Sequence, residues 1–166
     1  AVLCTPKNPD CGRCPFQRQC VAFNQQKIDQ LPFKAKTTKV RKRYFNYLVV
    51  SDSNSHYLLQ QRTAKDIWEQ LFEFPLVETT QTIKSSSALQ KTTAYQETFS
   101  EWNYPWKRWN PSPILHKLSH QQLYITFWTI QLNTALEEGM PWEQLTTKAV
   151  PVVIQNFIEN FFLRTP

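Results

Sequence analysis

The most constraining feature of this chain is a group of four cysteines near its start. Cys4, Cys11, Cys14 and Cys20 follow the spacing C-x6-C-x2-C-x5-C, and the sequence contains no other cysteine. Four thiols on one short loop can enclose a metal centre, because thiolates are ligands both of structural zinc and of iron–sulfur clusters. The same residues could instead form two disulfides.

Length and composition argue against disulfides. Disulfide frameworks serve small secreted domains that cannot build a sufficient core, whereas this chain has 166 residues, of which 41% are hydrophobic. No apolar signal-peptide core is visible either. Structural zinc sites usually combine two close cysteine pairs, but only Cys11 and Cys14 are close here. The spacing alone leaves both zinc and a [4Fe–4S] cluster open.

The residues around the cysteines resemble a known family. The run CTPKNPDCGRCPFQRQCVA, residues 4–22, closely resembles the iron–sulfur loop of the helix-hairpin-helix DNA glycosylases, which include endonuclease III and the MutY adenine glycosylases. The resemblance implies a [4Fe–4S] cluster bound by the four cysteines in the full-length parent, a cluster that an isolated chain can lack. It also implies that this loop meets the DNA backbone, with candidate phosphate contacts at Lys7, Arg13 and Arg18.

The chain is basic, and its positive charge is concentrated in one segment. Lys and Arg number 19 and Asp and Glu number 13, which gives a formal net charge of +6. Basic chains favour polyanions such as nucleic acid, and no run approaches the length of a membrane-spanning helix. Six basic residues crowd into ten positions: Lys34, Lys36, Lys39, Arg41, Lys42 and Arg43. We interpret this segment either as a solvated linker or as a phosphate-contacting segment in which Lys39 and Arg41 are candidates.

Hydrophobic patterning divides the chain into three parts. Residues 1–22 form the cysteine loop, residues 23–42 a connector, and residues 43–166 a globular domain. Within the domain, β-rich runs at 44–50 and 56–61 flank a polar turn, which indicates a hairpin. Further strands are expected around 71–74, 114–118 and 123–132, and helices over 85–101 and after Pro151. The prediction is an α+β domain with a mostly antiparallel sheet.

The run from Tyr57 to Glu78 resembles the first half of a Nudix-type domain. It reads YLLQQRTAKDIWEQLFEFPLVE, and the MutY family commonly has glycines where Asp66 and Gln70 stand here. The implied fold is a Nudix-like domain with an antiparallel or mixed sheet flanked by helices. A Nudix pyrophosphohydrolase needs several glutamates on a helix to hold Mg²⁺, whereas residues 79–97 contain one carboxylate, that of Glu97. We therefore expect a binding domain and reject the hydrolase.

A short polar motif follows further along the chain. The run His116-Lys117-Leu118-Ser119-His120 is similar to the Phe-Ser-His loop with which MutY-family proteins recognise 8-oxoguanine opposite adenine, with leucine in place of phenylalanine. In 8-oxoguanine N7 carries a hydrogen and C8 a carbonyl oxygen, and a serine hydroxyl both donates and accepts. The resemblance implies that Ser119 reads the lesion, that Leu118 packs beside it and that His120 contacts a phosphate. The alternative is an ordinary polar β-turn.

Aromatic residues gather in a second segment. Trp102, Tyr104, Trp106 and Trp109 surround Pro105. Stacking on unpaired bases is one role for such residues, and packing in a core or loop is the commoner one.

Together these features predict the C-terminal portion of an adenine DNA glycosylase of base-excision repair. We expect a monomer that binds double-stranded DNA containing 8-oxoguanine opposite adenine, in an intracellular location such as the bacterial cytoplasm and nucleoid. The family's catalytic helix-hairpin-helix domain lies upstream of the cluster, so no cleavage is expected from this chain by itself. The alternative is a protein-interaction module that binds a repair or replication protein through the basic connector at 34–43 or the aromatic loop at 102–109.

Overall fold

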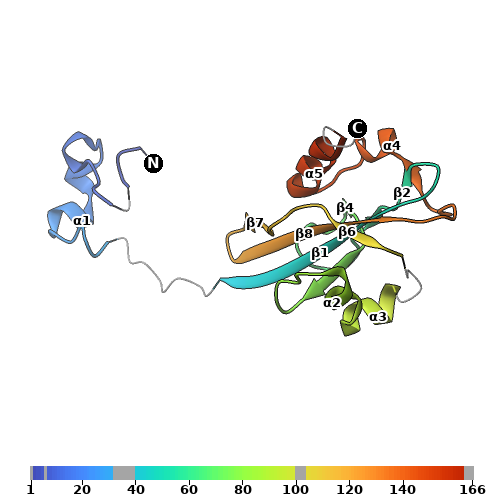
Figure 1. Ribbon diagram of the computed structural model, residues 1–166. Coiled ribbons are helices and arrows are strands. Elements are labelled where there is room, and N and C mark those ends of the chain that lie inside the picture. The colour runs from blue at the N-terminus through green and yellow to red at the C-terminus, as the bar shows by residue number, and fades with distance from the viewer. Residues whose placement is uncertain (1, 6, 32–39, 100–103, 163–166) are drawn as a thin grey trace. The chain divides into compact units, whose positions relative to one another are not determined.

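The computed structural model describes residues 2–5, 7–31, 40–99 and 104–162. The chain divides into two compact units, Ala1–Lys39 and Val40–Pro166, which we call the cysteine unit and the sheet unit (Figure 1). Across the described ranges, no helix has both the length and the apolar character needed to cross a membrane.

The cysteine unit consists of short helical turns joined by loops. It contains the 3-10 turns η1 (Cys11–Arg13) and η2 (Gln17–Gln19) and the single-turn helix α1 (Val21–Asn24). None of its described residues is fully buried, and Val2, Phe16 and Val21 are strongly exposed. A unit of this size without a core needs a covalent or metal staple to hold one structure.

The sheet unit is built on a seven-stranded mixed sheet, with a separate two-stranded sheet beside it. The two long strands, β1 (Arg41–Ser51) and β8 (Gln121–Gln131), pair in parallel from Arg41↔Gln121 to Ser51↔Gln131. The shorter strands of the large sheet pair antiparallel: β2 (His56–Tyr57), β5 (Leu76–Thr79), β6 (Trp106–Arg108), β7 (Ile114–Lys117) and β9 (Met140–Pro141). Strands β3 (Gln60–Gln61) and β4 (Phe72–Glu73) form the small sheet.

Helices cover both faces of the large sheet (Figure 1). Phe45, Tyr47 and Phe127 belong to one core, which α5 (Val152–Phe162) and α4 (Trp142–Leu145) complete. Leu48 and Trp128 belong to the second core, which includes residues of α2 (Ser86–Gln90) and α3 (Thr93–Phe99). Because successive residues of β1 point to opposite covered faces, its middle is continuously buried.

The α+β fold and most of the expected elements are confirmed, with differences in detail. The hairpin forms, but its return strand ends at Tyr57, and residues 60–61 pair instead with β4. The helix expected over 85–101 is two helices, and between them Thr92 Oγ1 donates to the Leu89 carbonyl at 2.7 Å and accepts from the Tyr95 N–H at 3.4 Å. The expected antiparallel pairs are present, yet the longest pairing is the parallel one.

The aromatic segment contributes to the cores. Trp106 is buried and meets Tyr95 edge to face at a centroid distance of 5.0 Å. Trp109 meets Phe157 at 4.8 Å. The packing role therefore holds for these two residues, while Trp102 lies outside the described residues.

The turn after β1 is organised around a buried carboxylate. Asp52 is 1% exposed, and its Oδ1 accepts from the backbone N–H groups of Asn54 at 2.8 Å and His56 at 2.9 Å. Its Oδ2 accepts from the N–H of Leu136 at 3.1 Å, which ties this turn to the segment after β8. The His56 ring lies with Nδ1 3.5 Å from the same Oδ2.

Replacing Asp52 with asparagine tests this turn. Burial alone would raise the pKa of Asp52, but the backbone N–H groups of His56, Leu136 and Asn54 hold that pKa below its ordinary value. A carboxylate with a lowered pKa stabilises the folded chain above its unfolded pKa of about 3.9, and this contribution is lost as pH falls through the folded pKa. In urea titrations Asp52→Asn should therefore be clearly less stable than wild type at pH 7, with the gap closing below about pH 4.

Glu137→Gln is the matched control, because Glu137 is an exposed carboxylate in the neighbouring segment. It should leave stability within about 0.5 kcal/mol of wild type at either pH. A gap between Asp52→Asn and wild type that is the same at both pH values would show that the carboxylate charge does not matter.

Candidate nucleic-acid interface

The four cysteines line one small cavity in the cysteine unit. All four are free thiols, and Leu3, Pro9 and Phe23 complete much of the wall. Burial, together with the neighbouring Cys20, Cys14 and Cys4, raises the pKa of Cys11. Among the described residues no group of three or more His, Cys, Asp or Glu is arranged to hold a metal ion. The structure thus gathers the thiols around a common space without closing a metal site.

This donor set fits an iron–sulfur cluster. Four thiolates are the usual ligands of a [4Fe–4S] cluster, and Leu3, Pro9 and Phe23 add apolar side chains to the wall that the four cysteines share. Cys4, Cys11, Cys14 and Cys20 would hold the cluster, which would supply the cross-link that this unit's missing core does not.

The predicted lesion motif forms the turn between β7 and β8. The N–H of Leu118 donates to the Gln121 carbonyl at 2.8 Å, which closes a four-residue turn with Ser119 and His120 at its exposed tip. Leu118 is half-buried and packs against the core on the α5 side of the sheet. The N–H of Arg41 donates to the His120 carbonyl at 3.0 Å. The β7–β8 turn is therefore anchored on both sides, while its two polar side chains face solvent.

The residues predicted to contact phosphates are divided between the two units of the chain. Arg41 is exposed and lies beside the β7–β8 turn through its bond to His120. Lys7 and Arg18 are exposed in the cysteine unit, where Arg13 lies 3.7 Å from the carboxylate of Asp10. Lys39 lies outside the described residues. His116 packs against the Trp68 ring at a centroid distance of 5.6 Å.

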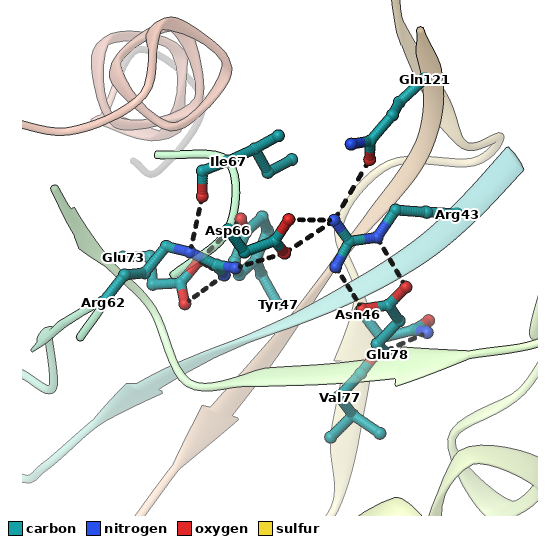
Figure 2. A network of polar contacts seen from close by, with 10 residues as sticks. All are labelled: Arg43, Asn46, Tyr47, Arg62, Asp66, Ile67, Glu73, Val77, Glu78 and Gln121. Atoms are coloured by element: carbon teal, nitrogen blue, oxygen red, sulfur yellow. Dashed lines mark hydrogen bonds and ion pairs between the residues drawn. The ribbon is translucent and has the colours of Figure 1, made fainter. Parts of the chain in front are cut away.

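A network of charged side chains contacts Gln121, the closing residue of the β7–β8 turn (Figure 2). It was not predicted from the sequence. We define the charge network as Arg43, Arg62, Asp66, Glu73 and Glu78. Arg43 is 6% exposed, and its Nε and Nη2 donate to the two carboxylate oxygens of Glu78 at 2.7 and 2.6 Å. The Nη1 of Arg62 donates to both carboxylate oxygens of Glu73 at 2.7 and 2.8 Å. Asp66 links the two arginines, 2.7 Å from Arg43 and 3.2 Å from Arg62.

Neighbouring groups complete the charge network. The hydroxyl of Tyr47 donates to Glu73 at 3.0 Å, and the Arg43 guanidinium lies 4.7 Å from the centre of the Phe45 ring. Arg43 also donates from Nη1 to the side-chain oxygen of Gln121 at 3.2 Å. Because Gln121 closes the β7–β8 turn, the network reaches the predicted reading site directly.

The pKa shifts follow from these contacts. The hydrogen bonds to Glu78 raise the pKa of Arg43. Burial raises the pKa of Glu73, although Arg62 opposes that shift. Burial would also raise the pKa of Asp66, but the N–H of Ile67 and the Arg43 guanidinium outweigh it and lower that pKa.

One sequence signal pointed to this network. A charged residue inside an apolar run is costly unless it is paired, and Glu73 stands between Phe72 and Phe74. Asp66 stands where the resemblance to the MutY family leads us to expect a glycine. Its carboxylate links the two arginines. Gln70, the other replacement, has φ 68° and so retains the left-handed backbone that favours glycine.

The arrangement does not suit metal-assisted hydrolysis. The three carboxylates that the fold brings together each contact an arginine, and helices α2 and α3, the first two after β5, carry a single acidic residue, Glu97. Hard divalent cations need several carboxylate oxygens that are not already neutralised. These residues therefore support a binding surface better than a hydrolase centre.

Two family profiles match the chain, one in each unit. The NUDIX domain profile matches residues 46–160, and the profile of the iron–sulfur binding domain of endonuclease III matches residues 4–20. The chain therefore belongs to the NUDIX domain family.

Curated relatives show which class of NUDIX-domain protein this chain is similar to. The adenine DNA glycosylase of Buchnera aphidicola subsp. Schizaphis graminum is 30% identical over 125 residues, which are 75% of this chain and 33% of the relative. That of Buchnera aphidicola subsp. Baizongia pistaciae is 25% identical over 131 residues, 78% of this chain and 34% of the relative. The chain thus spans about a third of the length of these relatives. They support the expected match to the C-terminal portion of a MutY-family adenine glycosylase, and in that family the cysteine motif binds a [4Fe–4S] cluster.

A solved structure supports the fold. The C-terminal domain of mouse MUTYH, determined in complex with human PCNA, is similar with a TM-score of 0.52 at 18% identity, covering 76% of this chain and 92% of the mouse domain. At this identity the likeness shows the fold alone, and it confirms the Nudix-like prediction.

The cysteine site makes a prediction that can be read spectroscopically. Incubating the whole chain with ferrous iron and sulfide under anaerobic conditions should give the visible absorption of a cluster and about four irons per chain. Cys14→Ser should lose both signals, because one of four ligands is removed. Gly12→Ala is the control, since its added Cβ would meet only Asp10 Oδ1, at 3.9 Å. Equal iron content in the two variants would show that these thiols do not bind the cluster.

The charge network makes a stability prediction. Glu73→Gln removes the buried charge that Arg62 contacts through two hydrogen bonds, and the two side chains are 4% and 8% exposed. Breaking a buried pair by removing one partner leaves an uncompensated charge, so chemical denaturation should show a loss of about 3–5 kcal/mol. Glu69→Gln is the control, at an exposed position in the loop between β3 and β4. It should change stability by less than about 0.5 kcal/mol. Similar losses for both variants would contradict a special role for the network.

Proposed function

We propose that this chain is the lesion-recognition part of an adenine DNA glycosylase of base-excision repair, and that it reads 8-oxoguanine opposite adenine in duplex DNA. One observation carries this proposal: the exposed Ser119–His120 tip of the β7–β8 turn, anchored by the N–H groups of Leu118 and Arg41. The adenine DNA glycosylase relatives and the iron–sulfur motif support it.

Serine has the hydrogen-bonding capacity that this lesion requires. Unmodified guanine presents N7 as an acceptor in the major groove, whereas 8-oxoguanine presents an N7–H donor and a C8 carbonyl acceptor. The hydroxyl of Ser119 can accept from the former and donate to the latter. The turn is anchored through its backbone and Ser119 is exposed, so its hydroxyl is accessible to a base.

The neighbouring residues fit supporting roles. Leu118 is held against the core, so it offers a fixed apolar surface beside the base, smaller than that of the phenylalanine in the resembling motif. His120 and Arg41 lie next to each other at the solvent-facing end of the sheet, where each can contact a phosphate. In the cysteine unit, Lys7, Arg13 and Arg18 are the corresponding candidates.

On this proposal the chain supplies recognition, and adenine release belongs to the helix-hairpin-helix domain of such enzymes. Its place is with the chromosomal DNA, inside the cell. A replication or repair protein as a further partner is in keeping with the mouse MUTYH domain, which was solved in complex with PCNA. The two segments assigned to that contact, 34–43 and 102–109, lie partly outside the described residues, so the partner stays a prediction.

Ser119→Ala tests the reading role. The ratio of dissociation constants for duplexes containing guanine:adenine and 8-oxoguanine:adenine should fall toward one, because the hydroxyl that tells the two bases apart is gone. A well-made base contact discriminates by about 1–3 kcal/mol, so the expected loss is about tenfold. Adenine release by the full-length parent enzyme, measured opposite both bases, should lose its preference in parallel.

Ser112→Ala is the matched control, because Ser112 is also an exposed serine, in the loop that precedes β7. It should leave the ratio unchanged. If Ser119→Ala also leaves the ratio unchanged, the β7–β8 turn is an ordinary polar turn and the lesion is read elsewhere.

A further inference from the structure

Gln121 stands immediately after the tip of the β7–β8 turn. It is the first residue of β8, two positions beyond Ser119, and its side chain is half-buried. In the parallel pairing it lies opposite Arg41, which is exposed. Its side chain therefore belongs to the same end of the sheet as the proposed lesion reader.

Arg43 fixes the orientation of the Gln121 amide. The Arg43 guanidinium is buried and held by Glu78 and Asp66, and its Nη1 also donates to Gln121 Oε1 at 3.2 Å. A guanidinium has five N–H donors and no acceptor, so only the oxygen of the amide can face it. The amide nitrogen must then point away from the arginine, as Figure 2 shows for the two ends of this side chain.

The amide nitrogen is left with unused donor capacity. Its two hydrogens have no acceptor among the described residues, although the oxygen end is bound. Rotating the amide to reverse the two ends would bring N–H groups against N–H groups of Arg43, which electrostatic repulsion opposes. The charge network thus holds the neutral amide of Gln121 in one orientation, two residues beyond Ser119. The Gln121 side chain keeps part of its surface exposed.

We propose that Gln121 Nε2 donates a hydrogen bond to an oxygen of the bound DNA, and that Gln121 is a second polar reader next to Ser119. This inference rests on the proposed function. The oxygen is either O8 of the lesion or an oxygen that both duplexes share, on guanine O6 or on a phosphate. Arg43 is then a positioning residue that acts through Gln121 and does not itself touch DNA.

Gln121→Glu removes the donor and keeps the acceptor that Arg43 contacts. Gln122→Glu is the matched control, because it adds the same negative charge one residue away, and adjacent strand residues point to opposite faces. In duplex binding, Gln121→Glu should weaken the 8-oxoguanine:adenine complex about tenfold more than Gln122→Glu does. Equal weakening by the two variants would overturn the proposal, since charge repulsion alone would then explain it.

The two duplexes separate the possible acceptors. If the extra loss occurs only with 8-oxoguanine:adenine, the acceptor is O8 of the lesion. If it occurs equally with guanine:adenine, the acceptor is an oxygen common to both. Either pattern supports the donor role of Gln121.

A second pair of variants guards against loss of the fold, because a new carboxylate at 121 would lie near Asp66 and Glu78. Gln121→Met removes the donor without adding charge, and Gln122→Met is its control, with thermal unfolding recorded for all four variants. If Gln121→Met binds as tightly as Gln122→Met, the donor role is excluded. The result for Ser119→Ala is independent: a preference that survives in Ser119→Ala but is lost in Gln121→Met would refute the serine reader and keep Gln121. A wild-type chain that does not bind DNA would refute both.

Discussion

The parallel pairing of β1 with β8 is the interaction on which the rest of the sheet unit depends. It joins eleven residues of each strand in continuous register, and every other strand of the large sheet attaches to this pair directly or through β2. Both cores are built on its two faces, so the pairing decides which side chains meet α5 and which meet α2 and α3. It also places Arg41 opposite Gln121, the closing residue of the β7–β8 turn. The first strand of the sheet unit thereby supports a turn that lies far from it in the sequence.

The charge network occupies the end of one core where hydrophobic packing gives way to the binding surface. Its arginines and carboxylates are exposed to different degrees, from 4% for Glu73 to 35% for Glu78. Such groups are costly to bury unless they are paired and hydrogen-bonded, and here Arg43 finds partners on β5, on the loop after β3 and on β8. The cost is offset by contacts that also fix the orientation of surface groups. A core completed with aliphatic residues at these positions would pack as well but would leave Gln121 free to rotate.

Features that depend on local sequence could be predicted, and those that depend on distant pairing could not. The cysteine spacing and the turn that carries Ser119 are each encoded within a short stretch, and they were recognisable for that reason. The parallel pairing joins segments far apart in the chain, and strand patterns alone do not specify a partner or its direction. The same limit hid the role of Arg43, which looked like one more charge in a basic segment. Asp66 looked like a departure from a glycine, and only the fold shows what its carboxylate contacts.

None of the described residues of the cysteine unit is fully buried. This affects how long the unit can stay folded in a cell. The sheet unit has two cores to maintain it, whereas the cysteine unit has only its centre of four thiols. With a cluster bound by these thiols, losing the cluster and losing the structure of this unit would be a single event. Iron starvation or oxidative damage would open one end of the chain to proteases while the Nudix-like end stayed folded. The oxidative stress that produces 8-oxoguanine would thus also threaten an iron–sulfur cluster bound by this unit.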